Sequence, residues 1–110
     1  MATSLEIALD DGDARVIRLI GELDLDSAPR SRESLDAAVT SASQPMVVLD
    51  LSELTFCDSS GVRVLLALHR LAAEAQRDLR IRDATSAVAQ VLNLTGADRV
   101  LLTTSDGDAA

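Results

Sequence analysis

Residues 47–68 read Val-Val-Leu-Asp-Leu-Ser-Glu-Leu-Thr-Phe-Cys-Asp-Ser-Ser-Gly-Val-Arg-Val-Leu-Leu-Ala-Leu. The apolar run at 47–51 is short and rich in β-branched side chains, which is typical of a strand buried on both faces. A loop is expected over 52–57, and after the polar turn 58–61 an apolar helix continues without proline or glycine to Gln76. A strand therefore leads into a helix through a hydroxyl-rich turn. We expect a serine of this turn to cap the free backbone N–H groups at the helix N-terminus.

The chain before this stretch contains a predicted hairpin and a predicted helix. Apolar residues alternate with others over 5–9, the turn Asp11-Gly12-Asp13 follows, and a second apolar segment occupies 16–20. This pattern indicates two antiparallel strands. The next helix is expected to begin with Ser27 as its cap. Its predicted core-facing positions are Leu35, Ala38, Val39 and Ala42.

The chain after the helix contains further elements, and the order of all of them predicts the fold class. We expect a short strand at 79–82, a third helix at 86–94 that ends at Gly96, and a last strand at 100–102. The resulting order is β-β-α-β-α-β-α-β. It predicts an α/β fold with a mixed, mainly parallel sheet of about five strands and helices packed on it. The predicted core positions of the central helix are Val64, Leu65, Leu68, Leu71, Ala72 and Ala75.

Length and composition indicate a small single domain. We expect one domain over 1–110, with a compact part at about 4–103 and a flexible tail at 104–110. The formal net charge is −8 and there is no lysine, so nucleic acid and membrane surfaces are not expected partners. One cysteine, Cys57, suits a reducing compartment, and no signal peptide or membrane-spanning run is apparent. These features predict a cytoplasmic protein.

Two short motifs resemble a known family. Gly21-Glu22-Leu23-Asp24 is followed about 35 residues later by Asp58-Ser59-Ser60-Gly61, which comes after a strand, a loop and Phe56. This pair resembles the STAS domain family, and within it the bacterial anti-sigma factor antagonists. The likeness extends from Leu5 to about Thr103.

The resemblance implies a phosphorylation switch at Ser59. The implied kinase is the cognate anti-sigma factor, an ATP-dependent serine kinase, and a serine phosphatase would reset the switch. The unphosphorylated antagonist would bind that kinase and release the sigma factor. Phosphate adds about −1.5 to −2 charges beside Asp58 and near Asp24, so repulsion and desolvation are expected to weaken binding.

The remaining residues of the expected partner surface each have two interpretations. Asp58 either orients the Ser59 hydroxyl or the partner's nucleotide-metal site, or it caps the helix. Glu22 and Asp24 either contact the partner or are simply the polar residues of a turn. Ser60 and Gly61 belong to the same surface, although a serine here can also be a cap. We expect Cys57 and Phe56 to be core residues.

Arg63 is a departure from the family pattern. Where such proteins usually continue Gly-Leu-Gly, this chain has Gly61-Val62-Arg63. On a helix Arg63 lies on the same side as Ser59, so its guanidinium could hold the phosphate in a bidentate manner or pair with Asp58. The simpler alternative is a solvated arginine. The change could also alter which kinase is recognised, or mark a STAS domain outside the phosphoswitch.

An enzymatic function is not expected. A pair of Ser59 and His69 would be about 15 Å apart along a helix, outside hydrogen-bond reach. Phosphate-binding glycine motifs and metal-ligand clusters are absent from the sequence, so we expect no cofactor and no metal. The alternative function is a STAS scaffold or ligand-binding module of a transport or signalling complex without phosphoregulation.

Overall fold

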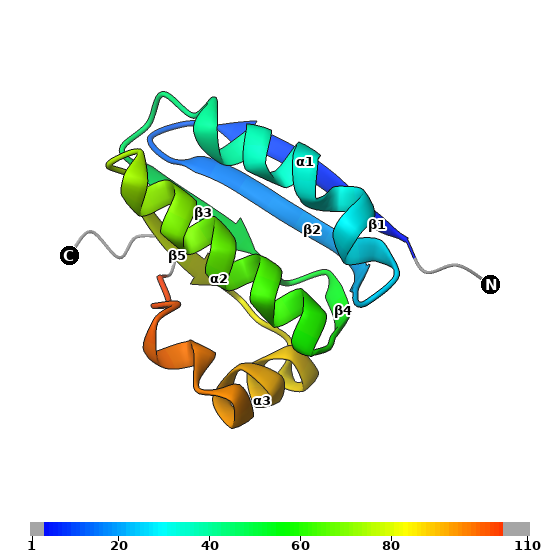
Figure 1. The fold of residues 1–110 in the computed structure, drawn as a ribbon. Helices are drawn as coiled ribbons and strands as arrows, with labels where there is room; N and C mark the ends of the chain where they lie inside the picture. The colour runs from blue at the N-terminus through cyan, green and yellow to red at the C-terminus, as the bar shows by residue number, and fades with distance from the viewer. Residues whose placement is uncertain (1–3, 105–110) are drawn as a thin grey trace.

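A computed structural model describes residues 4–104, and it has the α/β architecture that the sequence predicts (Figure 1). Five strands form one sheet and three α-helices accompany it. The elements in chain order are β1 (Leu5–Asp11), β2 (Arg15–Leu23), α1 (Ser27–Thr40), β3 (Met46–Asp50), β4 (Leu54–Cys57), α2 (Ser59–Glu74), β5 (Asp78–Arg82), α3 (Ser86–Thr95) and the 3₁₀ helix η1 (Ala97–Arg99).

The sheet is mixed and mainly parallel, as predicted. β1 and β2 form the antiparallel hairpin, while β3 lies parallel to β2 and β5 lies parallel to β3. β4 also pairs with β2 in parallel, so that β3 and β4 occupy successive stretches of the same neighbouring strand. As a consequence β2 and β4 end together, at Leu23 and Cys57.

A glycine lies where the pairing of β2 with β4 is irregular and where the chain before β1 approaches closely. The register of β2 against β4 shifts between Gly21 and Glu22, which is the mark of a β-bulge. Gly21 has a φ of 115°, and a Cβ there would lie 2.5 Å from the carbonyl oxygen of Ser4. Only glycine therefore fits at this position, which is the first residue of the Gly-Glu-Leu-Asp motif.

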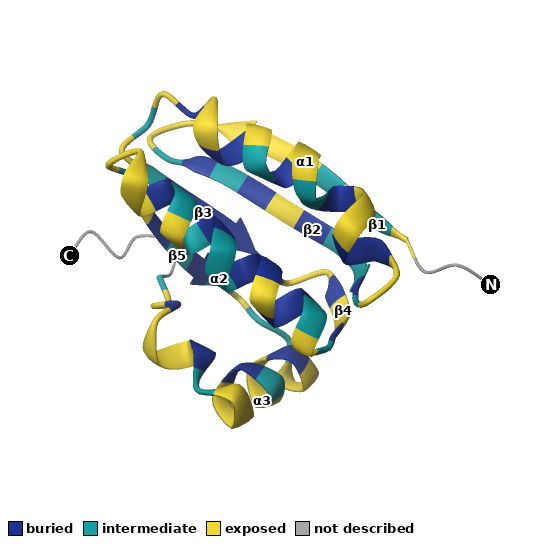
Figure 2. Ribbon diagram, in the orientation of Figure 1, coloured by how far each residue is buried: buried dark blue, intermediate teal, exposed yellow. Residues whose placement is uncertain are grey.

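The helices α1 and α2 lie side by side on one face of the sheet (Figure 1). Their inward faces are buried and their outward faces exposed, as Figure 2 shows. The core between these layers is aliphatic, and β3 is buried on both faces, as predicted. The predicted inward face of α1 is wholly buried, and that of α2 is buried at Val64, Leu65, Leu68 and Ala72 but exposed at Ala75.

The opposite face of the sheet carries an ion-pair network centred on Asp50, which is buried at the end of β3. Its Oδ2 accepts hydrogen bonds from Arg18 Nε at 3.3 Å and from Arg82 Nη2 at 3.1 Å. Its Oδ1 accepts one from the backbone N–H of Ser52 at 3.0 Å. Burial alone would raise the pKa of Asp50, but the hydrogen bonds from Ser52 and from the two arginines outweigh burial and lower that pKa to about 2.

Two predictions about the strands are wrong. The expected loop over 52–57 contains β4, and the expected last strand at 100–102 is absent. After η1 the chain makes only a single parallel bridge, between Ile81 and Thr103. The sheet therefore contains β4 in place of the predicted last strand. The observed order of elements is β-β-α-β-β-α-β-α.

The expected tail at 104–110 lies, from residue 105 onward, outside the described residues. Within the described part of the chain, no helix has both the length and the apolar character that crossing a membrane requires.

Candidate phosphorylation and partner-binding site

Ser59 is the first residue of α2, and it is exposed. The expectation that a serine caps this helix is wrong, because Asp58 occupies the N-cap position. The Asp58 Oδ1 accepts hydrogen bonds from the backbone N–H groups of Ser60 at 2.9 Å and Gly61 at 3.1 Å. The Ser59 hydroxyl forms no hydrogen bond within residues 4–104. It is therefore free to meet another molecule.

Asp58 also joins α2 to the segment between β2 and α1. Its Oδ2 accepts a hydrogen bond from the backbone N–H of Leu25 at 3.1 Å, across 33 positions of sequence. Its own backbone N–H donates to the Leu23 carbonyl at 3.3 Å. Of the two interpretations of Asp58, the geometry favours the cap, because three N–H groups already engage its carboxylate.

The Gly-Glu-Leu-Asp motif folds into a compact turn before α1. The Asp24 Oδ1 accepts hydrogen bonds from the backbone N–H groups of Asp26 at 3.0 Å and Ser27 at 2.9 Å. The Ser27 hydroxyl is buried and donates to the Glu22 carbonyl at 2.6 Å. Ser27 is thus not the cap that the sequence predicts. The N-cap position belongs to Asp26, whose side chain makes no capping hydrogen bond, and the first N–H of α1 is bound by Asp24 instead.

Gly61 and Cys57 pack beneath this turn. Gly61 is buried, and a Cβ there would clash with the Leu23 carbonyl oxygen and lie 2.7 Å from the Cys57 Sγ. Cys57 is buried, as predicted. Burial, and secondarily the negative charge of Asp58, raise the pKa of the Cys57 thiol to about 12. It stays protonated at neutral pH and is a packing residue, not a reactive nucleophile.

A shallow depression of about 520 Å³ lies beside the start of α2. It includes two large apolar side chains, Leu25 and Phe56, which are 75% and 48% exposed. Exposed apolar side chains that share a depression mark an interaction surface. The depression is lined by Asp24, Leu25, Asp26, Phe56 and Asp58.

Sequence reasoning missed both apolar residues. Phe56 was expected in the core, yet β4 is short and buries only its first and last residues. Leu25 stands alone between two aspartates, before the apolar periodicity of α1 begins. That isolation is the signal that could have identified it as a surface residue.

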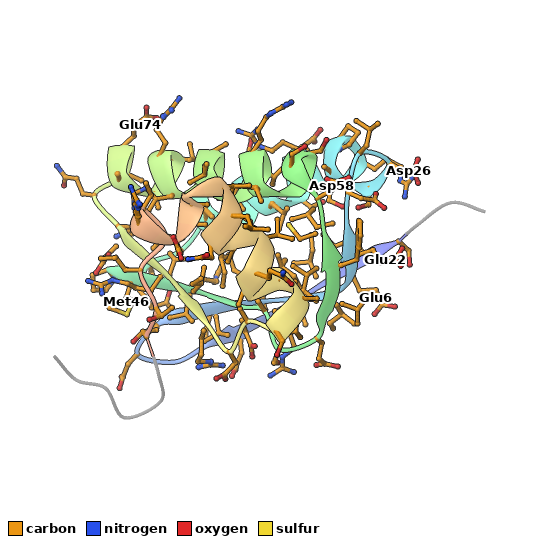
Figure 3. All side chains as sticks on the ribbon, turned by 90° about the horizontal axis from the view of Figure 1, so that it is seen from below. Glu6, Glu22, Asp26, Met46, Asp58 and Glu74 are labelled. Atoms are coloured by element: carbon orange, nitrogen blue, oxygen red, sulfur yellow. The ribbon has the colours of Figure 1, made fainter. Side chains whose placement is uncertain are left out.

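The other predicted site residues lie at the same end of the molecule. Figure 3 shows the acidic side chains of Glu6, Glu22, Asp26 and Asp58 there, far from Glu74. Glu22 and Ser60 are half-buried. Arg63 is exposed, one helical turn beyond Ser59.

Arg63 does not pair with Asp58, which was one of its expected partners, and it forms no other hydrogen bond or ion pair within residues 4–104. No group of three or more His, Cys, Asp or Glu side chains in the same range could hold a metal ion.

An exposed serine thus lies beside an acidic and apolar surface of a small α/β domain with a mixed sheet. The family model described as "Mlab, STAS domain" matches residues 8–103. The chain therefore belongs to the STAS domain family.

Two antagonists are among its relatives. An anti-sigma F factor antagonist of Paenibacillus polymyxa is 29% identical over 86 residues, which are 78% of this chain and 74% of that protein. The crystal structure of an anti-sigma factor antagonist from Mycobacterium paratuberculosis matches with a TM-score of 0.81 at 27% identity. That match covers 93% of this chain and 88% of the other.

More distant structures share the fold alone. The antagonist SpoIIAA in its unphosphorylated form matches with a TM-score of 0.73 at 22% identity, over 96% of this chain and 91% of that one. The murine anion transporter Slc26a9 matches with a TM-score of 0.70 at 13% identity, over 89% of this chain and 19% of the transporter. A fold common to an antagonist and a transporter does not by itself distinguish between the two expected functions.

Proposed function

We propose that this protein is an anti-sigma factor antagonist of the phosphorylated type. In its unphosphorylated form it binds an anti-sigma factor serine kinase in the cytoplasm and releases the sigma factor. The observation that carries the proposal is the exposed, unengaged hydroxyl of Ser59 at the start of α2. The names of the two antagonists described above support the same role.

The proposed interface surrounds Ser59. The exposed side chains of Leu25 and Phe56 supply apolar contact, and Glu22, Asp24 and Asp58 surround them with negative charge. Such a surface fits a partner with arginine or lysine side chains around an apolar centre. Ser60 and Gly61 contribute indirectly, because their N–H groups hold the Asp58 carboxylate that keeps Ser59 outside the cap.

Phosphorylation turns this surface off. The Ser59 Oγ forms a bond to the γ-phosphorus of ATP, the bond from that phosphorus to ADP breaks, and the hydroxyl proton passes to a base of the kinase or to water. The antagonist supplies only the hydroxyl. The new dianion lies next to Asp58, where the interface must desolvate both charges, and binding is lost. A serine phosphatase restores the hydroxyl by hydrolysis.

The test uses the kinase-type anti-sigma factors encoded in the genome of the source organism. Their binding is measured by calorimetry for the wild type, Ser59→Ala, Ser59→Asp and the neighbouring control Ser60→Ala. We expect the wild type and both alanine variants to bind with similar affinity, and Ser59→Asp to bind at least tenfold more weakly. With ATP, mass spectrometry should place one phosphoryl group on Ser59 in the wild type and in Ser60→Ala.

Two results would overturn the proposal. One is no phosphoryl transfer to Ser59 by any co-encoded kinase, and the other is equal binding by Ser59→Asp and the wild type. Either would favour the alternative function, a scaffold or ligand-binding module of a transport or signalling complex.

A further inference from the structure

The arginines of this protein fall into two groups. Six of the ten form ion pairs within residues 4–104, and none of these six belongs to α2. The other four, Arg63, Arg70, Arg77 and Arg99, form none in that range. Arg63 and Arg70 are both exposed on α2, and neither forms an ion pair or hydrogen bond within residues 4–104. An unpaired guanidinium in a protein of net charge −8 is available for an anion.

Arg63 lies where a group attached to Ser59 would meet it. Both residues belong to α2, four positions apart, so they are neighbours on one side of the helix with Cβ atoms about 5–6 Å apart. An anion placed N-terminal to a cation at this spacing is the more favourable of the two orders. The planar guanidinium can donate two parallel hydrogen bonds to phosphate oxygens.

Two acids of the depression beside the start of α2, Asp58 and Asp26, have partners of their own. The carboxylate of Asp58 accepts from three backbone N–H groups, at Ser60, Gly61 and Leu25. Asp26 forms its ion pair with Arg30 of α1 at 2.9 Å. An anion that appears on Ser59 therefore meets a cation that no neighbouring carboxylate occupies.

We infer that Arg63 binds the phosphoryl group of phosphorylated Ser59 and holds it against the first turn of α2. This inference rests on the proposed function, because it concerns the same serine in its modified form. With this contact the start of α2 is ordered in both the unphosphorylated and the phosphorylated protein. Without it, the acidic neighbours would only repel the phosphate. The contact also lowers the second pKa of the phosphate, so that the group carries its full charge at a lower pH.

The test places phosphoserine at position 59 during translation, so it needs no kinase. The ³¹P chemical shift of the phosphate is followed against pH in three proteins: the otherwise unchanged chain, Arg63→Gln, and the matched control Arg70→Gln. Arg70 is eleven residues from Ser59, about 16 Å along the helix. Arg70→Gln therefore removes the same charge from the same face of α2, far from the phosphate.

We expect the titration midpoint to rise by roughly 0.3 to 0.5 pH unit in Arg63→Gln and to stay unchanged in Arg70→Gln. The acids that face the phosphate (Asp24, Asp26 and Asp58) are identical in all three proteins and cancel in the comparison. His69 is about 15 Å from Ser59 along the helix and is likewise common to all three.

Two outcomes would overturn this role of Arg63. In one, Arg63→Gln leaves the midpoint where it was. In the other, both arginine variants raise it equally, which means that only the general charge of the helix acts. Thermal unfolding of the three unphosphorylated proteins checks that each folds. The phosphate is installed during translation, so the titration does not depend on a kinase. A titration that contradicts the role of Arg63 therefore leaves the proposed function standing, and absence of phosphorylation by a kinase does not alter the titration.

Discussion

Two residues of the Asp-Ser-Ser-Gly turn have structural tasks that set the position of Ser59. Asp58 caps α2, and Gly61 lets the first turn of α2 approach the end of β2. The Leu23 carbonyl and the Cys57 Sγ occupy the space in which a Cβ of Gly61 would lie. The carbonyl belongs to a paired strand and cannot move aside cheaply. The exposed serine is therefore held in place by its buried neighbours.

Gly61→Ala is expected to destabilise the protein, because the new methyl group overlaps the Leu23 backbone. The expected loss is about 3 kcal/mol in the free energy of unfolding, measured by urea denaturation. The control is Gly12→Ala in the β1–β2 turn, where a Cβ has no neighbour within 4 Å. It should change stability by less than about 0.5 kcal/mol. Equal stability of the two variants would contradict the close approach at Gly61.

The sequence predicts Ser59 and its neighbours as the site, but it assigns the helix caps to the wrong residues. Serine and aspartate are both good N-caps, and at both helix starts the two types occur close together. In the structure Asp24 and Asp58 accept the hydrogen bonds, while Ser27 is buried and Ser59 is exposed. Which nearby side chain accepts the first N–H groups of a helix depends on the path of the preceding strand, and local sequence does not specify that path.

The strands β3 and β4 share one neighbouring strand in the sheet. Both pair with β2, and the register shift at Gly21 and Glu22 lies within the pairing of β2 with β4. β4 was missed because Thr55 and Phe56 are exposed, so its four residues lack the alternation of a half-buried strand. The opposite error occurred at 100–102, an apolar run after η1 that forms no strand, because only the next residue, Thr103, bridges to β5. Apolar composition does not predict burial here either, since only Leu101 of the three residues is buried.

The Asp50 network links three strands, and its strength should depend on pH. The pKa of Asp50 is about 2 in the folded protein, below the ordinary value of 3.8. A depressed pKa stabilises the fold above the unfolded-state pKa, and that stabilisation is lost as the pH falls from about 4 to about 2. The contribution at neutral pH is about 2 kcal/mol.

Urea denaturation between pH 6 and about 2.5 of the wild type and of Asp50→Asn provides the measurement. The stability difference between them should be largest near neutral pH and should shrink by about 2 kcal/mol toward the acid end. The contributions of the other carboxylates to the free energy of unfolding cancel in this difference, because those groups are present in both proteins. A difference that stays constant across this range would show that the Asp50 carboxylate is not selectively stabilised by folding.

The whole molecule carries its proposed recognition surface at one end. Glu6, Glu22, Asp26 and Asp58 gather there, while Glu74 lies at the far end of α2 (Figure 3). With a net charge of −8, the molecule has a negative field that extends into solution. A basic partner is steered by such a field, and the contribution of each charge depends on its distance from the docking surface.

Glu22→Gln is expected to slow association with the anti-sigma factor by about two- to fivefold at low ionic strength. Glu74→Gln removes the same charge at the opposite end and should leave the association rate nearly unchanged. Stopped-flow measurements at about 0.02 M and 0.5 M salt provide the comparison, because the difference should disappear when the charges are screened. Equal slowing by both variants would indicate that net charge acts, without a localised acidic surface.

The hydrogen bond from Leu25 to Asp58 has a consequence for evolution and for engineering. Leu25 and Asp58 are 33 positions apart in the chain, yet the two segments that contain them supply hydrogen-bond partners to each other. Consider a chimaera that takes the turn containing Ser59 from a distant relative and keeps the original segment around Leu25. Its two segments would lack the hydrogen bonds that join them here. Such grafts should succeed only when both halves come from the same parent, so the inherited unit of specificity is the pair of segments.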